Sequence, residues 1–295
     1  MPLTVPLSAP LSPLSARQQA RYHRTCLVPG IGEEGQRRLL AAKVLVVGAG
    51  GLGSPVLLYL AAAGIGQLTI ADADVVESSN LQRQIIHTTT SVGTAKTASA
   101  AARIRGLNPD VSVSEHGWLT GENIDALVSE HDLVVECSDT FDTKFLVADA
   151  AARLGIPLVW GSIVAMTFQV GAFWSHAPAP YPATGLRDLY PDAPPAGTTP
   201  SSFDVGVLGA VCGQAGGVMA SEVVKLITGA GEPLLGRIVI ADAAAGRWNT
   251  VQYAPATKRV AAARQAAAQR LADPHHQPAM PDDDLLEDSG KGKHD

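Results

Sequence analysis

Residues 43–53, KVLVVGAGGLG, decide the fold class of this chain. The first five residues form a short apolar run typical of a strand buried on both faces of a sheet. The glycines that follow are Gly48, Gly50, Gly51 and Gly53, and residues 54–63 have the composition of a helix. This order is typical of a nucleotide site, because glycines let backbone N–H groups approach phosphates at the positive end of a helix.

A second apolar run, LTIAD at 68–72, predicts a strand that ends in Asp72. A carboxylate about 20 residues after the glycine loop is well placed to accept hydrogen bonds from ribose hydroxyls. We include the neighbouring Asp74 in the same site. Glycine loop, helix, second strand and carboxylate therefore follow the order of an adenine-nucleotide site, with a purely structural glycine turn as the alternative.

Short apolar runs continue to alternate with helix-compatible segments after Asp72. Further strands are expected at 111–115, 133–137 and 157–160, and helices at 94–105, 121–130 and 141–154. Gly106 and Gly155 are expected to end the first and the last of these helices. Continuously apolar strands are typical of a parallel sheet covered on both faces.

The pattern changes in the second half of the chain. Residues 163–174, 236–242 and 247–253 resemble antiparallel strands. A Pro-rich crossover at 176–204 and a long apolar helix near 206–228 lie between them. We therefore predict an α/β fold: a Rossmann-like, mostly parallel sheet with helices on both faces, extended by antiparallel strands.

Composition excludes several classes of protein. Of the 295 residues 46% are hydrophobic, enough for a full-sized core, and the net charge of −6 argues against nucleic-acid binding through bulk positive charge. Cys26, Cys137 and Cys212 are too few for a disulfide framework, and no CxxC occurs. Neither a signal peptide nor a membrane span is expected, so we expect a soluble, cytoplasmic protein without nucleic-acid or membrane partners.

The two ends of the chain differ from its middle. Residues 1–16 are expected to form a disordered Pro/Ser/Leu tail, and 273–295 a disordered, acidic one. Between them we expect one domain at 17–256, followed by an Ala- and Arg-rich helix at 257–272.

Two cations after the second strand favour ATP over a dinucleotide. Arg83 and Lys96 come close to one ribose carboxylate, and Arg and Lys are the usual partners of terminal phosphates. Taken alone, Lys96 fits a solvated surface lysine better than a phosphate ligand, and it is the combination with Arg83 and Asp72 that favours the phosphate site. Asp139 follows the fourth strand, where it could hold Mg²⁺ or instead cap the helix that begins near Phe141.

Longer stretches resemble the ThiF/MoeB/HesA family of sulfur-carrier adenylyltransferases, relatives of ubiquitin-activating enzymes. The stretches include VLVVGAGGLGSP (44–55), GIGQLTIADADVVESSNLQRQIIH (64–87), VGTAK (92–96), DLVVECSDTFDTK (132–144) and GVLGAVCGQAGGVMASEVVKLITGAGEPLLGR (206–237). They run in order through most of residues 21–242, so the joint pattern is much more specific than the glycine loop alone.

The resemblance implies a set of nucleotide-binding residues. This set is Gly48, Gly50, Gly51, Gly53, Asp72, Asp74, Ser79, Asn80, Leu81, Gln82, Arg83, Lys96, Asp139 and Thr140. Asp72 would bind the ribose, Arg83 and Lys96 the phosphates, and Asp139 the Mg²⁺. Arg24 would reach into the partner's ATP site, so the resemblance also implies a homodimer. The catalytic residues would be Arg83, Lys96, Asp139 and Arg24.

The implied reaction is the adenylation of a small ubiquitin-like sulfur-carrier protein that ends in Gly-Gly. The carrier's carboxylate attacks the α-phosphate of ATP and releases pyrophosphate, which prepares the carrier for thiocarboxylate formation in a molybdopterin- or thiamine-type pathway. A carboxylate is already ionised at neutral pH, so the site must supply in-line positioning and charge neutralisation rather than a general base.

The chain departs from the family pattern at three places. Both CxxC zinc segments are missing, since the corresponding stretches read APAPYPATG (177–185) and YAPATKR (253–259). We therefore predict no zinc site. Ser202 stands where some relatives have a reactive cysteine, so catalysis is expected to stop at the adenylate. Thr140 stands where relatives usually have Asn, which removes an amide contact beside Asp139.

Two further readings stay open. The fold also suits an NAD-dependent oxidoreductase, against which the positions of Arg83 and Lys96 argue. The missing zinc and cysteine positions suit a non-catalytic homologue that binds ATP and a carrier. The roughly 50 residues after 242 are too few for a rhodanese-like domain, so we expect the sulfur to come from elsewhere.

Overall fold

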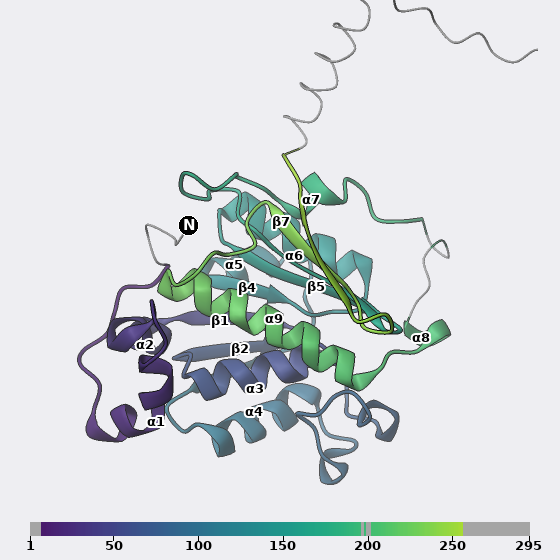
Figure 1. Ribbon diagram of the computed structural model, residues 1–295. Coiled ribbons are helices and arrows are strands. Elements are labelled where there is room, and N and C mark those ends of the chain that lie inside the picture. Colours follow the sequence, from purple (N-terminus) through teal and green to yellow (C-terminus); the bar gives the residue numbers. More distant parts are fainter. Residues whose placement is uncertain (1–6, 196–197, 199–201, 256–295) are drawn as a thin grey trace, which may run out of the picture. The chain divides into compact units, whose positions relative to one another are not determined.

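A computed structural model describes residues 7–195, 198 and 202–255 (Figure 1). It contains one eight-stranded sheet in the order β3-β2-β1-β4-β5-β6-β7-β8. The strands are β1 (Lys43–Val47), β2 (Gln67–Ala71), β3 (Ser112–His116), β4 (Leu133–Glu136), β5 (Leu158–Val164), β6 (Thr167–Phe173), β7 (Arg237–Asp242) and β8 (Arg247–Gln252). The five neighbouring strands β3, β2, β1, β4 and β5 are parallel to one another. Strands β6, β7 and β8 extend the sheet beyond β5 with antiparallel pairing. The predicted fold class is confirmed.

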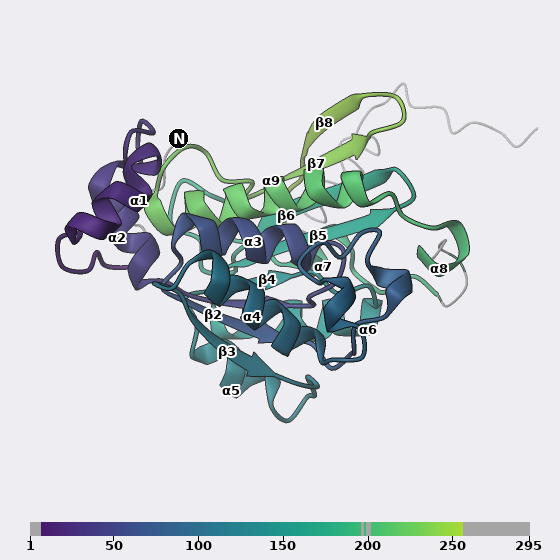
Figure 2. The same ribbon diagram turned by 90° about the horizontal axis from the view of Figure 1, so that it is seen from below.

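Helices cover both faces of this sheet. They are α1 (Ala16–Cys26), α2 (Gly32–Ala41), α3 (Gly53–Ala63), α4 (Lys96–Leu107), α5 (Ile124–Ser129), α6 (Phe141–Leu154), α7 (Leu186–Leu189), α8 (Ser202–Val205) and α9 (Gly209–Thr228). Helices α3, α4 and α9 lie on one face and α5 and α6 on the other (Figures 1 and 2). This arrangement leaves the carboxyl ends of the parallel strands accessible between the two helix layers.

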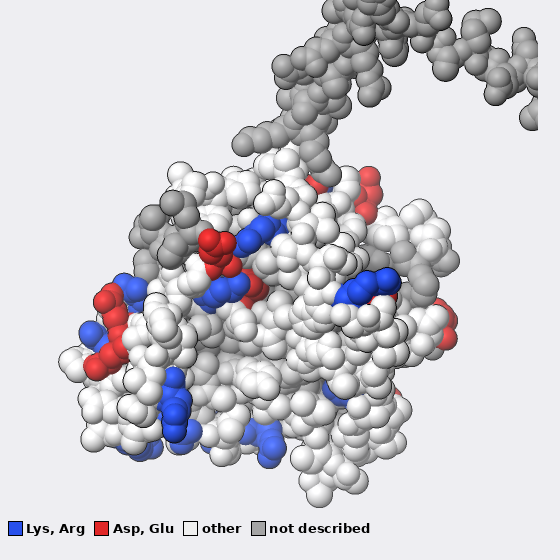
Figure 3. Space-filling view, in the orientation of Figure 1, with Lys and Arg blue, Asp and Glu red and all other residues white. Residues whose placement is uncertain are grey.

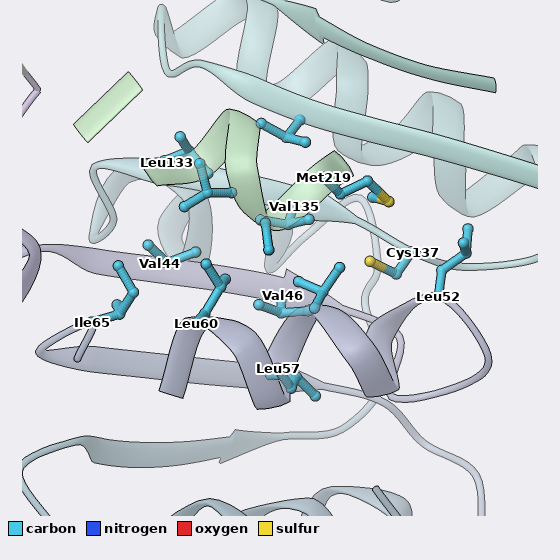
Figure 4. Packing of buried hydrophobic residues seen from close by; sticks show 14 of the residues in the cluster. Val44, Val46, Leu52, Leu57, Leu60, Ile65, Leu133, Val135, Cys137 and Met219 are labelled. Atoms are coloured by element: carbon cyan, nitrogen blue, oxygen red, sulfur yellow. The ribbon is translucent and has the colours of Figure 1, made fainter. Parts of the chain in front are cut away.

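Strand β1 shows why the sheet is covered on both sides. Val44 and Val46 pack into a cluster with Leu60 of α3 and Met219 of α9 (Figure 4). The alternate residue Leu45 points the other way, into a cluster with residues of α5 and α6. Because successive side chains of a strand face opposite sides, a wholly apolar run requires a hydrophobic layer on each side.

Helix α9 is the long apolar helix predicted near 206–228. Its 20 residues, with a mean hydropathy of 1.2, are long and apolar enough to cross a membrane by length and composition alone. The helix instead packs against α2, α3, β5 and β6, and 56% of its apolar window is buried. A Cβ at Gly216 would lie 2.4 Å from Cγ of Pro55, so glycine allows α9 and α3 to approach closely. These are the contacts of a core helix.

The described part of the N-terminal tail also differs from expectation. Leu14 and Ser8 are buried, and the Ser8 hydroxyl donates a hydrogen bond to Asp132, 3.3 Å away. Ser15 then caps α1 by accepting a hydrogen bond from the backbone of Gln18. The expected disorder of residues 1–16 is therefore wrong from residue 7 onward, because contacts with distant parts of the chain hold this segment in place.

Gly106 does not end its helix, which continues to Leu107. A single glycine in a helix costs only about 1 kcal/mol, and tertiary contacts at the end of α4 offset that cost. Ile104 is buried, and the Asn108 side chain donates to the carbonyl of Ala61, 2.7 Å away. Gly155 does end α6, in the left-handed conformation, as predicted. The expected helix at 257–272 and tail at 273–295 lie outside the described residues.

Candidate active site

The glycine loop between β1 and α3 has a geometry that only glycine allows at two positions. Gly48 has a φ of 91°, a left-handed conformation that other residues rarely adopt. At Gly53 a Cβ would lie 1.9 Å from the carbonyl oxygen of Gly48. The loop therefore closes tightly on itself at the start of α3, where unpaired N–H groups favour an anion.

Asp72 connects this loop to the end of β2. One carboxylate oxygen accepts a hydrogen bond from the backbone N–H of Ala49 at 2.7 Å, and the other from that of Asp74 at 2.9 Å. The side chain of Asp72 thus fixes the glycine loop and still borders the cleft. Both features suit the ribose-binding position predicted for it.

The two predicted cations lie in the same cleft. Lys96 begins α4 with its side chain only 8% exposed, and its ammonium donates to the Asp74 carboxylate at 2.8 Å. Arg83 is half-buried and donates to the carbonyl of Ser79 at 3.3 Å. Since Lys96 is largely buried, the simple reading as a solvated surface lysine is wrong.

Asp139 follows β4 at the floor of the predicted site. The alternative reading, that Asp139 caps α6, is wrong because the cap is Thr140, whose hydroxyl accepts a hydrogen bond from the backbone of Thr143. Asp139 is exposed, borders the cleft and makes no hydrogen bond or ion pair with any described residue. A free carboxylate beside a phosphate site fits Mg²⁺, which binds proteins through one or two carboxylates and substrate phosphates.

These elements enclose a cleft of about 720 Å³ at the carboxyl ends of β1, β2, β4 and β5. The predicted residues that line it are Gly48, Gly50, Gly51, Asp72, Asp74, Arg83, Lys96, Asp139 and Thr140. The predicted residues that do not line it are Gly53, Ser79, Asn80, Leu81, Gln82 and Arg24. Asn80 instead accepts a hydrogen bond from the backbone of Glu77, and so stabilises the turn that carries Arg83.

Arg24 lies far from the cleft of its own chain. It is exposed on α1, and the neighbouring Arg21 donates to the carbonyl of Leu107, close to where β3 begins. This is the end of the sheet opposite the cleft. Figure 3 shows Lys and Arg side chains along the edge where α1 and α4 lie. Arg24 can therefore serve a nucleotide site only in another copy of the chain.

Sequence reasoning missed two buried polar residues that support the site. His87 contacts the carbonyl of Ala49 through Nε2 at 3.0 Å and the hydroxyl of Ser99 through Nδ1 at 2.9 Å. Because a carbonyl only accepts, Nε2 carries the proton, and burial lowers the pKa of His87. Lys144 lies in the cleft wall, paired with the buried Glu136. The stretches quoted for the family resemblance contain both residues.

The apolar part of the cleft could not be read from the sequence either. Trp118, Phe145, Trp160 and Tyr190 border it from four separate parts of the chain: the loop after β3, α6, β5 and the end of α7. Trp160 and Tyr190 contact each other with ring centroids 5.7 Å apart. No local pattern connects these residues, because only the fold brings them to one place.

Two of the three cysteines also border the cleft. Burial raises the pKa of the Cys137 thiol well above its usual range, and raises that of Cys212 to about 11. Cys212 is buried on α9, as expected, and its sulfur would lie 3.0 Å from a Cβ placed on Gly51. Thiols with such pKa values remain protonated at neutral pH and are poor nucleophiles.

The two segments where relatives carry zinc ligands have other contacts here, as far as the structure describes them. Among the described residues no three His, Cys, Asp or Glu side chains are grouped to hold a metal ion. In the crossover, Trp174 donates to the carbonyl of Gly155 at 2.8 Å and Tyr181 packs against the core. The second segment, 253–259, is described only to residue 255, so the expected absence of zinc stays a prediction.

Fold and cleft together define a Rossmann-like nucleotide-binding protein whose site collects positive charge for phosphates. A model of the ThiF family matches residues 22–262, and the chain belongs to this family. The family resemblance seen in the sequence is therefore confirmed.

Several named proteins are similar to most of this chain. Probable adenylyltransferase/sulfurtransferase MoeZ of Mycobacterium tuberculosis is 46% identical over 258 residues, 86% of this chain and 66% of MoeZ. The SAMP-activating enzyme E1 of Haloferax volcanii is 44% identical over 81% of this chain and 87% of its own length. The sulfur carrier protein adenylyltransferase of Thermus thermophilus is 46% identical over 76% of this chain and 83% of its own length. The chain thus spans slightly less than two thirds of MoeZ.

Solved structures support the fold. PaaA superposes with a TM-score of 0.69 at 24% identity, over 82% of this chain and 76% of PaaA. Escherichia coli MccB superposes with a TM-score of 0.69 at 23% identity, over 81% of this chain and 71% of MccB. At this level of identity the likeness concerns the arrangement of the chain alone.

Proposed function

We propose that this protein adenylates the C-terminal carboxylate of a small ubiquitin-like sulfur-carrier protein, using Mg²⁺ and ATP. The observation that carries the proposal is the cleft itself. There a glycine loop, a ribose-type carboxylate, two cations and the unpaired carboxylate of Asp139 converge. The names of the Haloferax and Thermus relatives support the same class of reaction and the same kind of substrate.

The residues account for each requirement of that reaction. A carboxylate oxygen of the carrier attacks the α-phosphorus, and the bond to the bridging oxygen between the α- and β-phosphates breaks. Arg83 and Lys96 stabilise the negative charge that moves onto the leaving pyrophosphate. Asp139 is the residue that would hold Mg²⁺, which supplies further neutralisation of phosphate charge when bound. The attacking carboxylate is already ionised, so no general base is required.

The active form we propose is a homodimer in which Arg24 completes the partner's ATP site. The position of Arg24 on α1, at the opposite end of the sheet from its own cleft, supports an ATP site that is shared between two subunits. We also propose that the reaction ends at the acyl-adenylate, since Ser202 cannot form a thioester or persulfide. Molybdopterin and thiamine synthesis are the pathway types that suit such a product.

Isotope exchange between pyrophosphate and ATP tests the proposal directly. Exchange should require Mg²⁺ and a carrier that ends in Gly-Gly. Arg83→Ala should abolish it in a folded protein, and Ser202→Ala should leave it intact. ATP rather than NADH should raise the melting temperature, because a ligand stabilises the state that binds it. Preference for NADH would favour an oxidoreductase, and ATP binding without exchange would favour a non-catalytic homologue.

A further inference from the structure

We propose that the buried Lys144–Glu136 pair positions Asp139 for the metal–nucleotide complex. The Lys144 side chain is 4% exposed and that of Glu136 is fully buried, with 2.7 Å between Nζ and Oε2. This inference rests on the proposed function but concerns residues that the reaction itself does not use. Neither side chain has to contact the nucleotide, so both are positioning residues.

All three protons of the Lys144 ammonium have acceptors. They are donated to Glu136 Oε2 at 2.7 Å, to the carbonyl of Ser138 at 2.7 Å and to the carbonyl of Gly161 at 2.8 Å. These acceptors belong to the end of β4, to the turn that follows it and to β5. One side chain from the first turns of α6 therefore ties three segments of the cleft floor together.

Glu136 holds the same turn from the other side. Its second oxygen accepts hydrogen bonds from the backbone N–H of Ser138 at 2.7 Å and from the Ser138 hydroxyl. Both peptide groups of Ser138 are thereby fixed, the N–H by Glu136 and the carbonyl by Lys144. Because that carbonyl belongs to the peptide bond leading into Asp139, the direction in which Asp139 leaves the turn is fixed as well.

The residue after Asp139 is held too. Thr140 caps α6 through its hydroxyl, which accepts a hydrogen bond from the Thr143 backbone at 3.3 Å. Between these two anchored residues, Asp139 has no described partner and borders the cleft. A metal ligand with a constrained backbone loses less conformational freedom on binding, and groups that orient a ligand in this way commonly affect metal affinity 10- to 100-fold.

A purely structural role for the pair is the competing explanation, and the chain offers a matched control. Glu222 and Lys225 form a second ion pair on α9, and their side chains are 3% and 25% exposed. Glu222 also accepts a hydrogen bond from a backbone N–H, that of Leu234, at 2.7 Å. This pair does not border the cleft, so it is a largely buried ion pair with a buried carboxylate, away from the position of the Lys144–Glu136 pair.

The test compares two double variants, E136Q/K144M and E222Q/K225M, each of which removes both charges and leaves no lone buried ion. ATP binding is measured by calorimetry over a range of Mg²⁺ concentrations, without a carrier protein. Mg²⁺ is expected to increase the affinity for ATP. We expect the Mg²⁺ concentration at which half of this increase is reached to rise about 10- to 100-fold in E136Q/K144M. It should remain at the wild-type value in E222Q/K225M.

A charge-conserving variant covers the case in which E136Q/K144M does not fold. Glu136→Asp keeps the pair but shortens the side chain by one methylene, so it withdraws the oxygen bound to Ser138. It should also raise the Mg²⁺ requirement. Folded variants with the wild-type Mg²⁺ dependence, or an equal shift in E222Q/K225M, would overturn the inference. Missing carrier-dependent exchange in the wild type, with Mg²⁺-dependent ATP binding intact, would instead contradict the proposed function alone.

Discussion

Lys96 and Asp74 form an ion pair at the mouth of the cleft, with 2.8 Å between Nζ and Oδ2. The two side chains differ in environment, since that of Lys96 is 8% exposed and that of Asp74 is 66% exposed. Asp74 also accepts a hydrogen bond through its backbone carbonyl from the N–H of Lys96 at 2.9 Å. The Asp74 carboxylate thus holds the Lys96 ammonium in the cleft. When a nucleotide binds, its phosphate can replace Asp74 as the partner of Lys96, because the exposed Asp74 carboxylate can then be solvated by water.

This asymmetry predicts unequal effects of mutating the two partners. Lys96→Ala should lower the rate of pyrophosphate exchange roughly 100- to 1000-fold, the usual cost of losing a donor aimed at developing charge. Asp74 also lines the cleft, but its carboxylate is paired with Lys96, so Asp74→Asn should have a smaller effect, within about fivefold, because a partly exposed ion pair contributes at most about 1 kcal/mol. Steady-state exchange rates of both folded variants check this, and equal losses would contradict the phosphate-binding role of Lys96.

Two helical glycines, Gly53 at the start of α3 and Gly213 inside α9, should change the stability of the protein in opposite directions when replaced by alanine. Gly53→Ala places a Cβ 1.9 Å from the Gly48 carbonyl, and we expect it to lower the free energy of unfolding by roughly 3 kcal/mol or more. Gly213→Ala on α9 meets no atom within 4 Å and should raise it by about 0.5–1 kcal/mol. Urea denaturation measures both, and a stable G53A variant would show that the loop can open without cost.

The main elements of the fold were predictable because each depends on local pattern. The run at 43–47 is apolar on both sides, the glycines after it stand where the chain turns sharply, and Gly155 ends a helix in the left-handed conformation. The errors involve contacts between distant residues. Ser8 bonds to Asp132, and Asn108 bonds to the carbonyl of Ala61, and no pattern within either segment contains its partner.

The site was predictable to the extent that its residues follow strands. Asp72 and Asp139 come directly after β2 and β4, and parallel strands end on the same side of a sheet. Lys144 was missed because lysine is seldom buried and because Glu136 completes an otherwise apolar strand. Their pairing depends on the approach of β5, which brings the Gly161 carbonyl within 2.8 Å.

Mixing two inactive variants should restore activity if Arg24 acts in the partner's site. Arg24→Ala lacks the donated arginine, and Arg83→Ala lacks a cation of its own cleft, so each homodimer should be inactive. A heterodimer contains one cleft with both arginines. An equal mixture that has exchanged subunits should therefore regain about a quarter of wild-type pyrophosphate exchange. Mixing either variant with the double variant R24A/R83A is the control, and activity that stays absent in the first mixture would contradict the shared site.

Two buried histidines should make the fold less stable in mild acid. Burial lowers the pKa of His87 and of His131 from the ordinary value of 6.5, and each ring makes two hydrogen bonds. Below pH 6.5 the unfolded chain takes up protons that the folded chain resists, so the free energy of unfolding falls as the pH drops from 6.5 toward the folded-state pKa values. His87→Gln can still donate to the Ala49 carbonyl, and should reduce this pH dependence while lowering stability at pH 7.5. Urea midpoints at pH 7.5 and 5.5 measure the slope, with the exposed His23→Gln as the control; an unchanged slope in H87Q would mean that His87 titrates normally in the folded protein.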